Sequence, residues 1–243
     1  MYNTDMKYRR IILAALAVTA SWLFVQSLLT RRKMAEKLLP TIADIEEQQP
    51  DWINFVVIGD SLSIGLGADK YTDTPGLLLK NMIAKNIDHG VNYFNFGLSG
   101  ATCKDLIEQA NFAVQVQPDI IVVFCGSNDV KGGKNLKSNL DALKKALLKL
   151  QETSAEIYFI PCVDLNVVKA IPMPLRGVLG VISQNYSKVQ SRVAKATGAK
   201  VLDHSVIGTE FANDPTLFAK DKFHPSSKGY KKIAEHIFEQ MRK

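Results

Sequence analysis

The sequence is poor in cysteine, and this scarcity argues against two kinds of small structural scaffold. Its 243 residues contain three cysteines, Cys103, Cys125 and Cys162, which is an odd number without Cys-x-x-Cys spacing. Such a set predicts neither a disulfide framework nor a structural zinc site. We therefore expect buried free thiols, because a free cysteine behaves as a small apolar side chain.

Patterns typical of metal binding and of nucleic-acid binding are also missing. His89, His204 and His236 have no metal-ligand spacing, so we interpret them as structural or solvated and expect neither a metal nor another cofactor. The net charge is +6, but the sequence has no long basic tract interleaved with aromatic residues. Nucleic acid is therefore not an expected partner. The sequence also shows no internal repeat and predicts no oligomeric state.

What the sequence does contain is typical of one globular domain behind an apolar segment. Hydrophobic residues make up 47% of the chain and charged residues 22%, which are ordinary globular values. The length is enough for one good core. We divide the chain into a basic flank and membrane anchor at 1–33, a linker or stalk at 34–50, and a globular domain at 51–243.

Residues 11–29 form the apolar segment, a run without any charged residue between two basic flanks. At about 1.5 Å per residue this run spans about 28 Å, which matches a bilayer core. A cleaved signal peptide is the alternative, but the run exceeds a usual signal-peptide core and lacks a small-x-small ending. We therefore predict one uncleaved transmembrane helix. Basic residues flank both ends almost equally, so the positive-inside rule does not fix its orientation.

Five short apolar runs alternate with helical patterns in the rest of the chain. The predicted strands lie near 55–59 and at 92–96, 119–125, 156–160 and 200–203. The predicted helices lie at 75–86, 136–150, 182–197 and 226–242, the last with a serine N-cap at Ser226. This alternation predicts a three-layer α/β/α sandwich with a mostly parallel five-stranded sheet.

The first strand ends in Gly59-Asp60-Ser61, which would expose Ser61 at the carboxyl edge of the sheet. An isolated serine of this kind is more often a simple turn residue. A nucleophilic serine needs a base and donors for an oxyanion. We interpret Asp60 as a brace of the turn.

Later segments supply the groups that a serine nucleophile needs. In Asp221-x-x-His224, a tight turn can place the carboxylate beside the imidazole, which fixes its tautomer and lets His224 accept the proton of Ser61. The backbone N–H groups of Ser61 and Gly100 and the side-chain amide of Asn128 could stabilise the oxyanion. The Asp203-His204 pair is a second, weaker candidate near the same edge.

Four blocks in this order resemble the GDSL, or SGNH, hydrolase superfamily. They are Gly-Asp-Ser-Leu-Ser at 59–63, Gly-Leu-Ser-Gly-Ala-Thr at 97–102, Gly-Ser-Asn-Asp at 126–129 and Asp-Lys-Phe-His-Pro at 221–225. The resemblance implies a flavodoxin-like sheet, with Ser61 as nucleophile, His224 as base and Asp221 as its orienter. It also implies Gly100 and Asn128 as oxyanion donors. Many members have Gly-Gly-Asn-Asp or Gly-Thr-Asn-Asp in the third block, a departure that leaves Asn128 untouched.

These features predict a serine esterase that cleaves carboxylic esters of lipids or small acyl groups through an acyl-enzyme. Alternatives within the enzyme class are a deacetylase of cell-envelope saccharides, a thioesterase or lysophospholipase, and an acyltransferase. A catalytically silent binding module is the alternative outside it, because a fold does not fix a function. We expect a membrane-anchored protein with a periplasmic or otherwise extracytoplasmic domain, since members of this family often act on envelope or extracellular esters.

Residues 163–181 form an apolar segment with two prolines, which we interpret as a loop after the fourth strand. Its length suggests a lid or a substrate-binding segment, although it could equally pack on the core. If exposed, its apolar side chains, including Met173 and Leu179, would accept an acyl chain or rest on a membrane. Arg176 would then meet an anionic headgroup.

Overall fold

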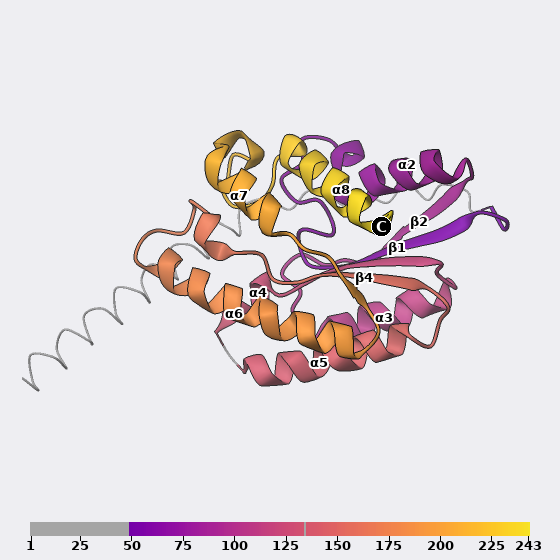
Figure 1. The fold of residues 1–243 in the computed structure, drawn as a ribbon, viewed down its shortest axis with the longest axis horizontal. Helices are drawn as coiled ribbons and strands as arrows, with labels where there is room; N and C mark the ends of the chain where they lie inside the picture. Colours follow the sequence, from indigo (N-terminus) through magenta and orange to yellow (C-terminus); the bar gives the residue numbers. More distant parts are fainter. Residues whose placement is uncertain (1–48, 134) are drawn as a thin grey trace, which may run out of the picture.

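The computed structural model describes residues 49–133 and 135–243, which form a five-stranded sheet between two layers of helices (Figure 1). The strand order is β2-β1-β3-β4-β5, and every neighbouring pair is parallel. The predicted three-layer sandwich is confirmed, and this order is that of flavodoxin-like sheets. The strands are β1 (Ile53–Gly59), β2 (Val91–Asn95), β3 (Ile120–Phe124), β4 (Glu156–Ile160) and β5 (Lys200–Val201).

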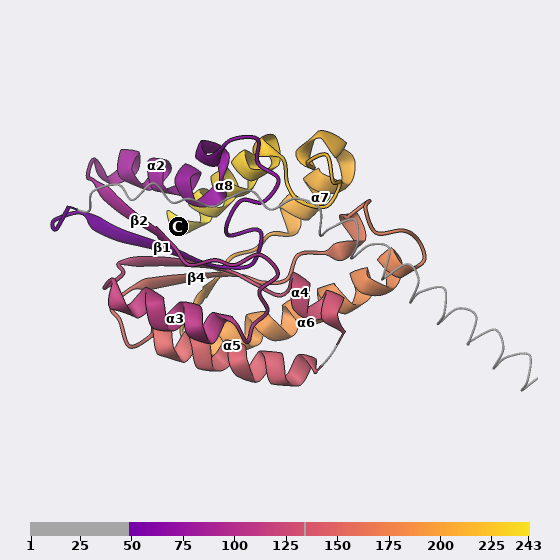
Figure 2. The ribbon, with the colours of Figure 1, turned by 180° about the vertical axis from the view of Figure 1, so that it is seen from behind.

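Alternate residues of the central strands supply two separate cores, because successive side chains of a strand point to opposite faces. Val56 and Ile58 of β1 pack with α3 (Leu106–Gln115), α5 (Leu136–Leu150) and α6 (Leu175–Ala196). Phe55 and Val57 pack on the other face with α2 (Pro75–Ile87) and α8 (Ser227–Met241). Figures 1 and 2 show these two helical layers from opposite sides. Both faces of β1 are thus covered, which explains its continuous apolar run.

Three α-helices and three 3₁₀ turns of the described residues were not predicted from the sequence. They are α3, α4 (Ser127–Gly132), α7 (Ser205–Asn213) and the 3₁₀ turns η1 (Tyr71–Asp73), η2 (Leu165–Val167) and η3 (Pro215–Leu217). The buried face of α3 consists of Leu106, Gln109, Ala110 and Ala113. An amphipathic pattern requires an apolar residue at the position of Gln109. Because this residue is polar, the sequence pattern did not predict α3.

The start of α6 differs most from the sequence-based prediction. The predicted helix began at residue 182, whereas α6 begins at Leu175, so 163–181 is not one continuous loop. The two prolines, Pro172 and Pro174, suggested a loop, but Pro174 lies at the N-cap of α6, and Gly180 lies inside the helix. A Cβ atom at Gly180 would lie 2.6 Å from the Cβ atom of Asn166, so a glycine is required where α6 crosses η2.

Helix caps were predicted more accurately. The hydroxyl of Ser226 accepts a hydrogen bond from the backbone N–H of Gly229 at 3.2 Å, which confirms the serine N-cap of α8. Thr74 occupies the N-cap of α2, with proline at the first helical position. Its hydroxyl, however, donates to the carbonyl of Tyr71 and caps nothing.

The predicted anchor at 11–29 and nearly all of the linker at 34–50 lie outside the described residues. Among residues 49–133 and 135–243, no helix is both long enough and apolar enough to cross a membrane.

Candidate active site

The carboxyl ends of β1 and β3 lie side by side, because Gly59 pairs with Phe124 in the parallel ladder. After β1 the chain forms β2 on one side of it, and then crosses over to form β3 on the other side. Such a reversal opens a crevice at the carboxyl edge of the sheet, where α/β proteins bind their ligands. Ser61 follows β1 and Asn128 follows β3, so both residues lie at this crevice.

Gly59 allows the nucleophile loop to leave the sheet. Its φ is +138°, and a Cβ atom there would lie 2.0 Å from the carbonyl oxygen of Phe124. Asp60 then braces the turn, because its carboxylate accepts the backbone N–H of Leu62 at 2.9 Å. The predicted bracing role of Asp60 agrees with this contact. Burial raises the pKa of Asp60 to about 6, although the Leu62 N–H, Lys131 and His224 act in the opposite direction.

Ser61, His224 and Asp221 form a hydrogen-bonded relay. The Nε2 atom of His224 lies 3.1 Å from the hydroxyl oxygen of Ser61, and its Nδ1 atom lies 2.6 Å from a carboxylate oxygen of Asp221. Ser61 is 7% exposed and His224 4%, so the pair is largely shielded from solvent. This geometry allows His224 to remove the serine proton while Asp221 orients the ring.

The second carboxylate oxygen of Asp221 accepts the backbone N–H groups of Phe223 and His224 at 2.9 and 3.0 Å. Partial burial acts to raise the pKa of Asp221, but the His224 side chain and these N–H groups outweigh it and leave the pKa below its usual value. The carboxylate therefore stays ionised beside the imidazole.

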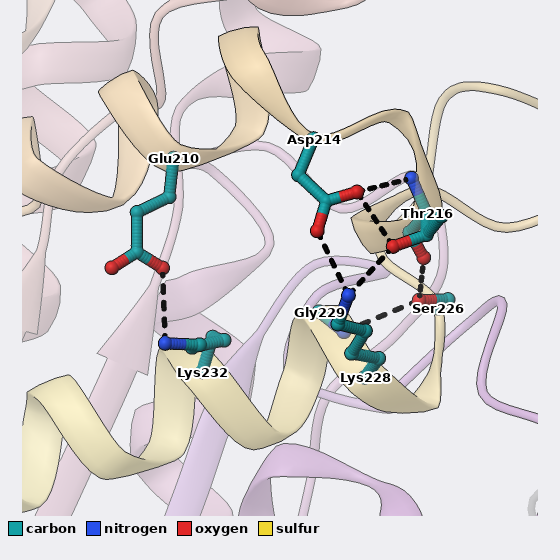
Figure 3. Close-up of polar contacts among 7 residues, drawn as sticks. All are labelled: Glu210, Asp214, Thr216, Ser226, Lys228, Gly229 and Lys232. Carbon is teal, nitrogen blue, oxygen red and sulfur yellow. Dashed lines mark hydrogen bonds and ion pairs between the residues drawn. The ribbon is translucent and has the colours of Figure 1, made fainter.

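A polar network fixes the segment around η3, which precedes Asp221 and His224 in the chain, to the start of α8 (Figure 3). Lys228 on α8 donates to the Asp214 carboxylate and to the Thr216 hydroxyl, both at 2.8 Å. Ser226 donates to the carbonyl of Thr216 at 2.8 Å. The backbone N–H of Ala219 also donates to the carbonyl of His224 at 2.8 Å, which closes the turn.

The expected oxyanion donors gather at the same edge. The side-chain amide of Asn128 donates one hydrogen to the carbonyl of Ala101 at 2.9 Å, which ties Asn128 to the loop of Gly100. An amide carries two hydrogens, so one is left for a substrate oxygen. The backbone N–H groups of Ser61 and Gly100 donate to no acceptor within the described part of the chain. All three predicted donors are thus available, and their role in catalysis stays a prediction.

Cys103, Cys125 and Asp129 form a buried cluster whose possible ligand atoms all lie within 4.8 Å of one another. A thiophilic cation would suit this donor set. Hydrogen bonds also account for it, because Asp129 accepts the backbone N–H of Cys103 at 3.2 Å and the Cys125 thiol at 3.8 Å. The hydrogen bond with Cys103 and burial raise the pKa of the Cys125 thiol. All three cysteines of the chain are free and buried, as expected.

Two buried glutamines brace the edge, and the sequence analysis did not find them. Gln109 of α3 accepts the N–H of Gly59 at 2.6 Å and donates to its carbonyl at 3.0 Å. Gln190 of α6 accepts the N–H of Cys162 at 2.8 Å and donates to the carbonyl of Cys125 at 3.3 Å. A glutamine at an apolar position of a helix is the only sequence signal that could have revealed them.

The remaining candidate residues lie apart from the relay. His89 and His236 contact the carbonyls of Asp51 and Asp203, which agrees with structural roles. His204 lines a cavity on the α7 and α8 side of the sheet, and the structure shows no contact between it and Ser61.

The segment at 163–181 does not present one apolar surface. Ile171 is buried and Leu179 packs on an adjacent core cluster, so Ile171 does not meet the condition of exposure and Leu179 meets it only in part. Met173 is 57% exposed, while Arg176 is partly exposed on the first turn of α6. Whether Met173, Arg176 and Leu179 bind substrate stays a prediction.

Comparison with known families identifies the domain. The model of the GDSL-like Lipase/Acylhydrolase family matches residues 57–232, which include all four sequence blocks. The chain belongs to the GDSL-like lipase/acylhydrolase family. Its membership agrees with the resemblance inferred from the sequence.

Two proteins that are similar to this chain in sequence are named as esterases. The GDSL-like esterase Rv1075c of Mycobacterium tuberculosis is 27% identical over 194 residues, covering 78% of this chain and 62% of the relative. The acetylxylan esterase of Xylanibacter ruminicola is 26% identical over 230 residues, covering 81% of this chain and 44% of the relative. This GDSL-like chain therefore spans only part of the length of each.

Solved structures of low identity share the fold. The psychrotrophic esterase EstA from Pseudoalteromonas sp. superposes with a TM-score of 0.62 at 18% identity, covering 78% of this chain and 96% of EstA. The acetylxylan esterase Axe2 from Geobacillus stearothermophilus gives 0.62 at 19% identity, covering 78% and 94%. At such identities the likeness supports the fold alone.

Proposed function

We propose that this GDSL-like protein is a serine esterase that hydrolyses carboxylic esters through an acyl-enzyme. The observation that carries the proposal is the relay in which His224 lies 3.1 Å from the Ser61 hydroxyl and 2.6 Å from Asp221. Serine is a weak nucleophile near neutral pH, and a hydrogen-bonded imidazole removes this limitation.

In the first half of the reaction, the Ser61 oxygen attacks the ester carbonyl and its proton moves to Nε2 of His224. The developing oxyanion accepts hydrogen bonds from Ser61, Gly100 and Asn128. When the tetrahedral intermediate collapses, the carbon–oxygen bond to the alcohol breaks, and His224 protonates the departing alkoxide.

In the second half, His224 removes a proton from a water molecule that attacks the acyl carbonyl. The bond to Ser61 breaks, the serine oxygen recovers a proton from His224, and the carboxylic acid leaves. Asp221 keeps the ring oriented and stabilises its positive charge throughout, without taking the proton.

The decisive experiment replaces Ser61. We expect Ser61→Ala to fold normally, to lose hydrolysis of p-nitrophenyl acetate and butyrate, and to escape covalent labelling by a fluorophosphonate. Ser63→Ala is the matched control, since the Ser63 hydroxyl donates to the Asp60 carbonyl inside the same loop. Full hydrolysis by Ser61→Ala would exclude this mechanism, and an inert but folded wild type would favour the silent binding module.

Deacetylation of saccharides is a second candidate for the natural reaction. It is favoured by the name of the similar acetylxylan esterase from Xylanibacter ruminicola. Release of acetate from acetylated xylo-oligosaccharides, compared with p-nitrophenyl esters and acyl-thioesters of two to twelve carbons, separates this candidate from lipid esterase and thioesterase activity. Transfer of the acyl group to an added alcohol would instead indicate an acyltransferase.

For location, we propose that residues 11–29 anchor the chain in a membrane and that the hydrolase domain lies outside the cytoplasm. The uncharged run between basic flanks supports the anchor. Protease added to intact cells should remove the domain. Complete protection of the domain there, with digestion after lysis, would refute the placement.

A further inference from the structure

The solvent side of α6 carries exposed aliphatic side chains. The residues of this helix that are buried against the rest of the domain are Leu175, Gly180, Ser183, Tyr186, Gln190 and Ala194. On the solvent side, Val178, Val181 and Ile182 are 36–62% exposed, and Val189 continues the series two turns further on. Residues three, four and seven positions apart share one side of a helix. These four side chains therefore form one aliphatic row, with Asn185 between Ile182 and Val189, which we call the outer row.

Neither helix formation nor internal packing accounts for the outer row. Single exposed aliphatic residues are normal on a protein surface, but a continuous row of them is typical of a contact surface. Valine and isoleucine also have a lower helix propensity than lysine, glutamate or alanine, because a helix restricts their χ1 rotamers. The four residues thus weaken α6 slightly while they remain largely exposed to solvent.

The charge on this segment has a single sign. Between residues 165 and 202 the chain contains six basic residues and no aspartate or glutamate. Lys188, Arg192 and Lys195 are exposed and recur at steps of four and three, so they form a basic row beside the outer row. An aliphatic row and a basic row therefore run next to each other along α6.

This charge disfavours a second copy of the chain as the occupant of the face. In a symmetric dimer the same surface of both copies meets at the interface, so two basic rows would approach each other. Asp164 is an acidic residue in contact with α6, since its carboxylate accepts a hydrogen bond from the Gln184 side chain at 2.9 Å. One carboxylate does not balance six cations, so the face suits an anionic partner.

We propose that the outer row of α6 rests in the surface of an anionic lipid bilayer, with Lys188, Arg192 and Lys195 against the lipid phosphates. A bilayer presents a negative headgroup layer directly above an apolar interior, which is the arrangement that the two rows require. From Val178 to Val189 the row spans about 16 Å at about 1.5 Å per residue, so the helix lies along the surface. This contact depends neither on ester hydrolysis nor on the proposed anchor at 11–29.

A single fluorescent label on the full chain, incorporated into lipid vesicles, tests the proposal. Val181→Cys carries an NBD group on the outer row. Val206→Cys is the matched control, because Val206 is also an exposed valine in a helix, but lies on α7 in the opposite helical layer (Figure 1). The native cysteines are buried, so the label reacts with the introduced thiol.

The vesicles contain phosphatidylcholine and phosphatidylglycerol at about three to one, which gives them a negative surface potential. Lipids that carry a nitroxide on the acyl chain quench a label that lies among the chains. We expect them to quench the Val181 label at least threefold more strongly than the Val206 label. Val178→Cys, on the same row, gives the same result if Val181→Cys does not fold.

Lipid charge separates this contact from simple tethering. An anchor at 11–29 would keep both labels near the vesicle whatever the charge of the lipid. The excess quenching at Val181 should therefore disappear in phosphatidylcholine alone, and it should fall in about 1 M salt, where the Debye length is about 3 Å.

Charge reversal on α6 tests the basic row. One basic residue near an anionic surface strengthens binding about fivefold, so Lys188→Glu combined with Arg192→Glu should weaken the contact at least tenfold. Lys70→Glu combined with Lys85→Glu makes the same change of charge at exposed positions outside α6 and should leave the quenching unchanged.

Equal quenching of the two labels in the anionic vesicles would overturn the proposal. So would excess quenching that persists in phosphatidylcholine alone or after the reversal of Lys188 and Arg192. A blue shift of the Val181 label that grows with protein concentration in the absence of lipid would assign the face to a second copy and also overturn it. None of these readouts measures ester hydrolysis, so an inactive protein leaves the test intact.

Discussion

Asp221 uses its two carboxylate oxygens for different tasks. One oxygen contacts the imidazole of His224, and the other accepts the backbone N–H groups of the same turn. The side chain therefore sets both the ring orientation and the shape of the turn that presents it. The proposed mechanism needs a carboxylate for the first task, because a carboxylate stabilises an imidazolium that forms during the reaction.

Replacing Asp221 by asparagine separates the two tasks. The amide can still accept backbone hydrogen bonds, but it carries no charge and can present an N–H to the ring. We expect kcat for p-nitrophenyl butyrate to fall by about 10³–10⁴ with little change in KM. Asp141→Asn, which alters an exposed carboxylate on α5, should leave both constants unchanged. A loss below tenfold in Asp221→Asn would contradict the assigned role.

Asp60 should make stability depend on pH. Its pKa is about 6 in the folded protein against an ordinary 3.8, so folding favours the neutral acid. This contribution is complete below pH 3.8 and is lost as pH rises through 6. The difference corresponds to about 3 kcal/mol.

We therefore expect Asp60→Asn, which stays neutral, to gain stability relative to the wild type by up to about 3 kcal/mol between pH 4 and pH 8. Urea denaturation across this range measures the difference, and Asp141→Asn provides the baseline. A difference that does not vary with pH would show that Asp60 is not held in its neutral form.

At the scale of elements, the start of α8 connects the catalytic turn to the rest of the fold. Ser226 caps the helix by accepting from Gly229, and it also donates to Thr216 on the preceding segment. This hydroxyl lies two residues after His224. Loss of the hydroxyl therefore weakens the helix start and the attachment of the turn together.

Ser226→Ala should reduce the free energy of unfolding by about 1 kcal/mol, the usual cost of losing an N-cap. Ser226→Thr keeps a hydroxyl and should retain most of the stability. Urea denaturation of both variants gives the comparison. Equal losses in the two would mean that crowding at this position, and not the hydroxyl, matters.

Helices and strands could be predicted where a single apolar or amphipathic pattern runs through the whole element. β3 and α5 follow uninterrupted apolar or amphipathic patterns, and both were located within a residue or two. The start of α6 was missed because two prolines normally mark a loop, whereas here Pro174 lies at the N-cap and Gly180 is required by the approach of η2. Contacts between distant segments decided that case, and local propensity could not show them.

At the scale of the whole molecule, the two cores share one sheet. Leu147 of α5 and Ile237 of α8 are buried on opposite faces, yet both face side chains of β1 and β3. Neither helical layer can therefore separate from the sheet without uncovering strands that the other layer needs.

We expect Leu147→Ala and Ile237→Ala each to cost about 2–5 kcal/mol and to leave a single unfolding transition. The double variant should lose the sum within about 0.5 kcal/mol, because the sites share no contact. Far-ultraviolet and near-ultraviolet circular dichroism should give coincident curves. Two separate transitions would show that one layer unfolds alone.

The relay was predictable from four short blocks because each block ends a strand or precedes a helix, and parallel strands bring their carboxyl ends together. The cavity beside His204 was not predictable. Its wall combines side chains from the sheet, α7, α8 and the segment before α8, so its existence depends on how these segments pack.

The turn that holds both Asp221 and His224 also determines how the relay responds to motion. The carboxylate is fixed to the backbone of its own turn, so a displacement of the turn carries the imidazole and its partner as one rigid body. Of the two distances in the relay, only the gap of 3.1 Å between His224 and Ser61 then varies. In the proposed relay, the position of a single turn relative to the sheet therefore sets the one distance that can vary.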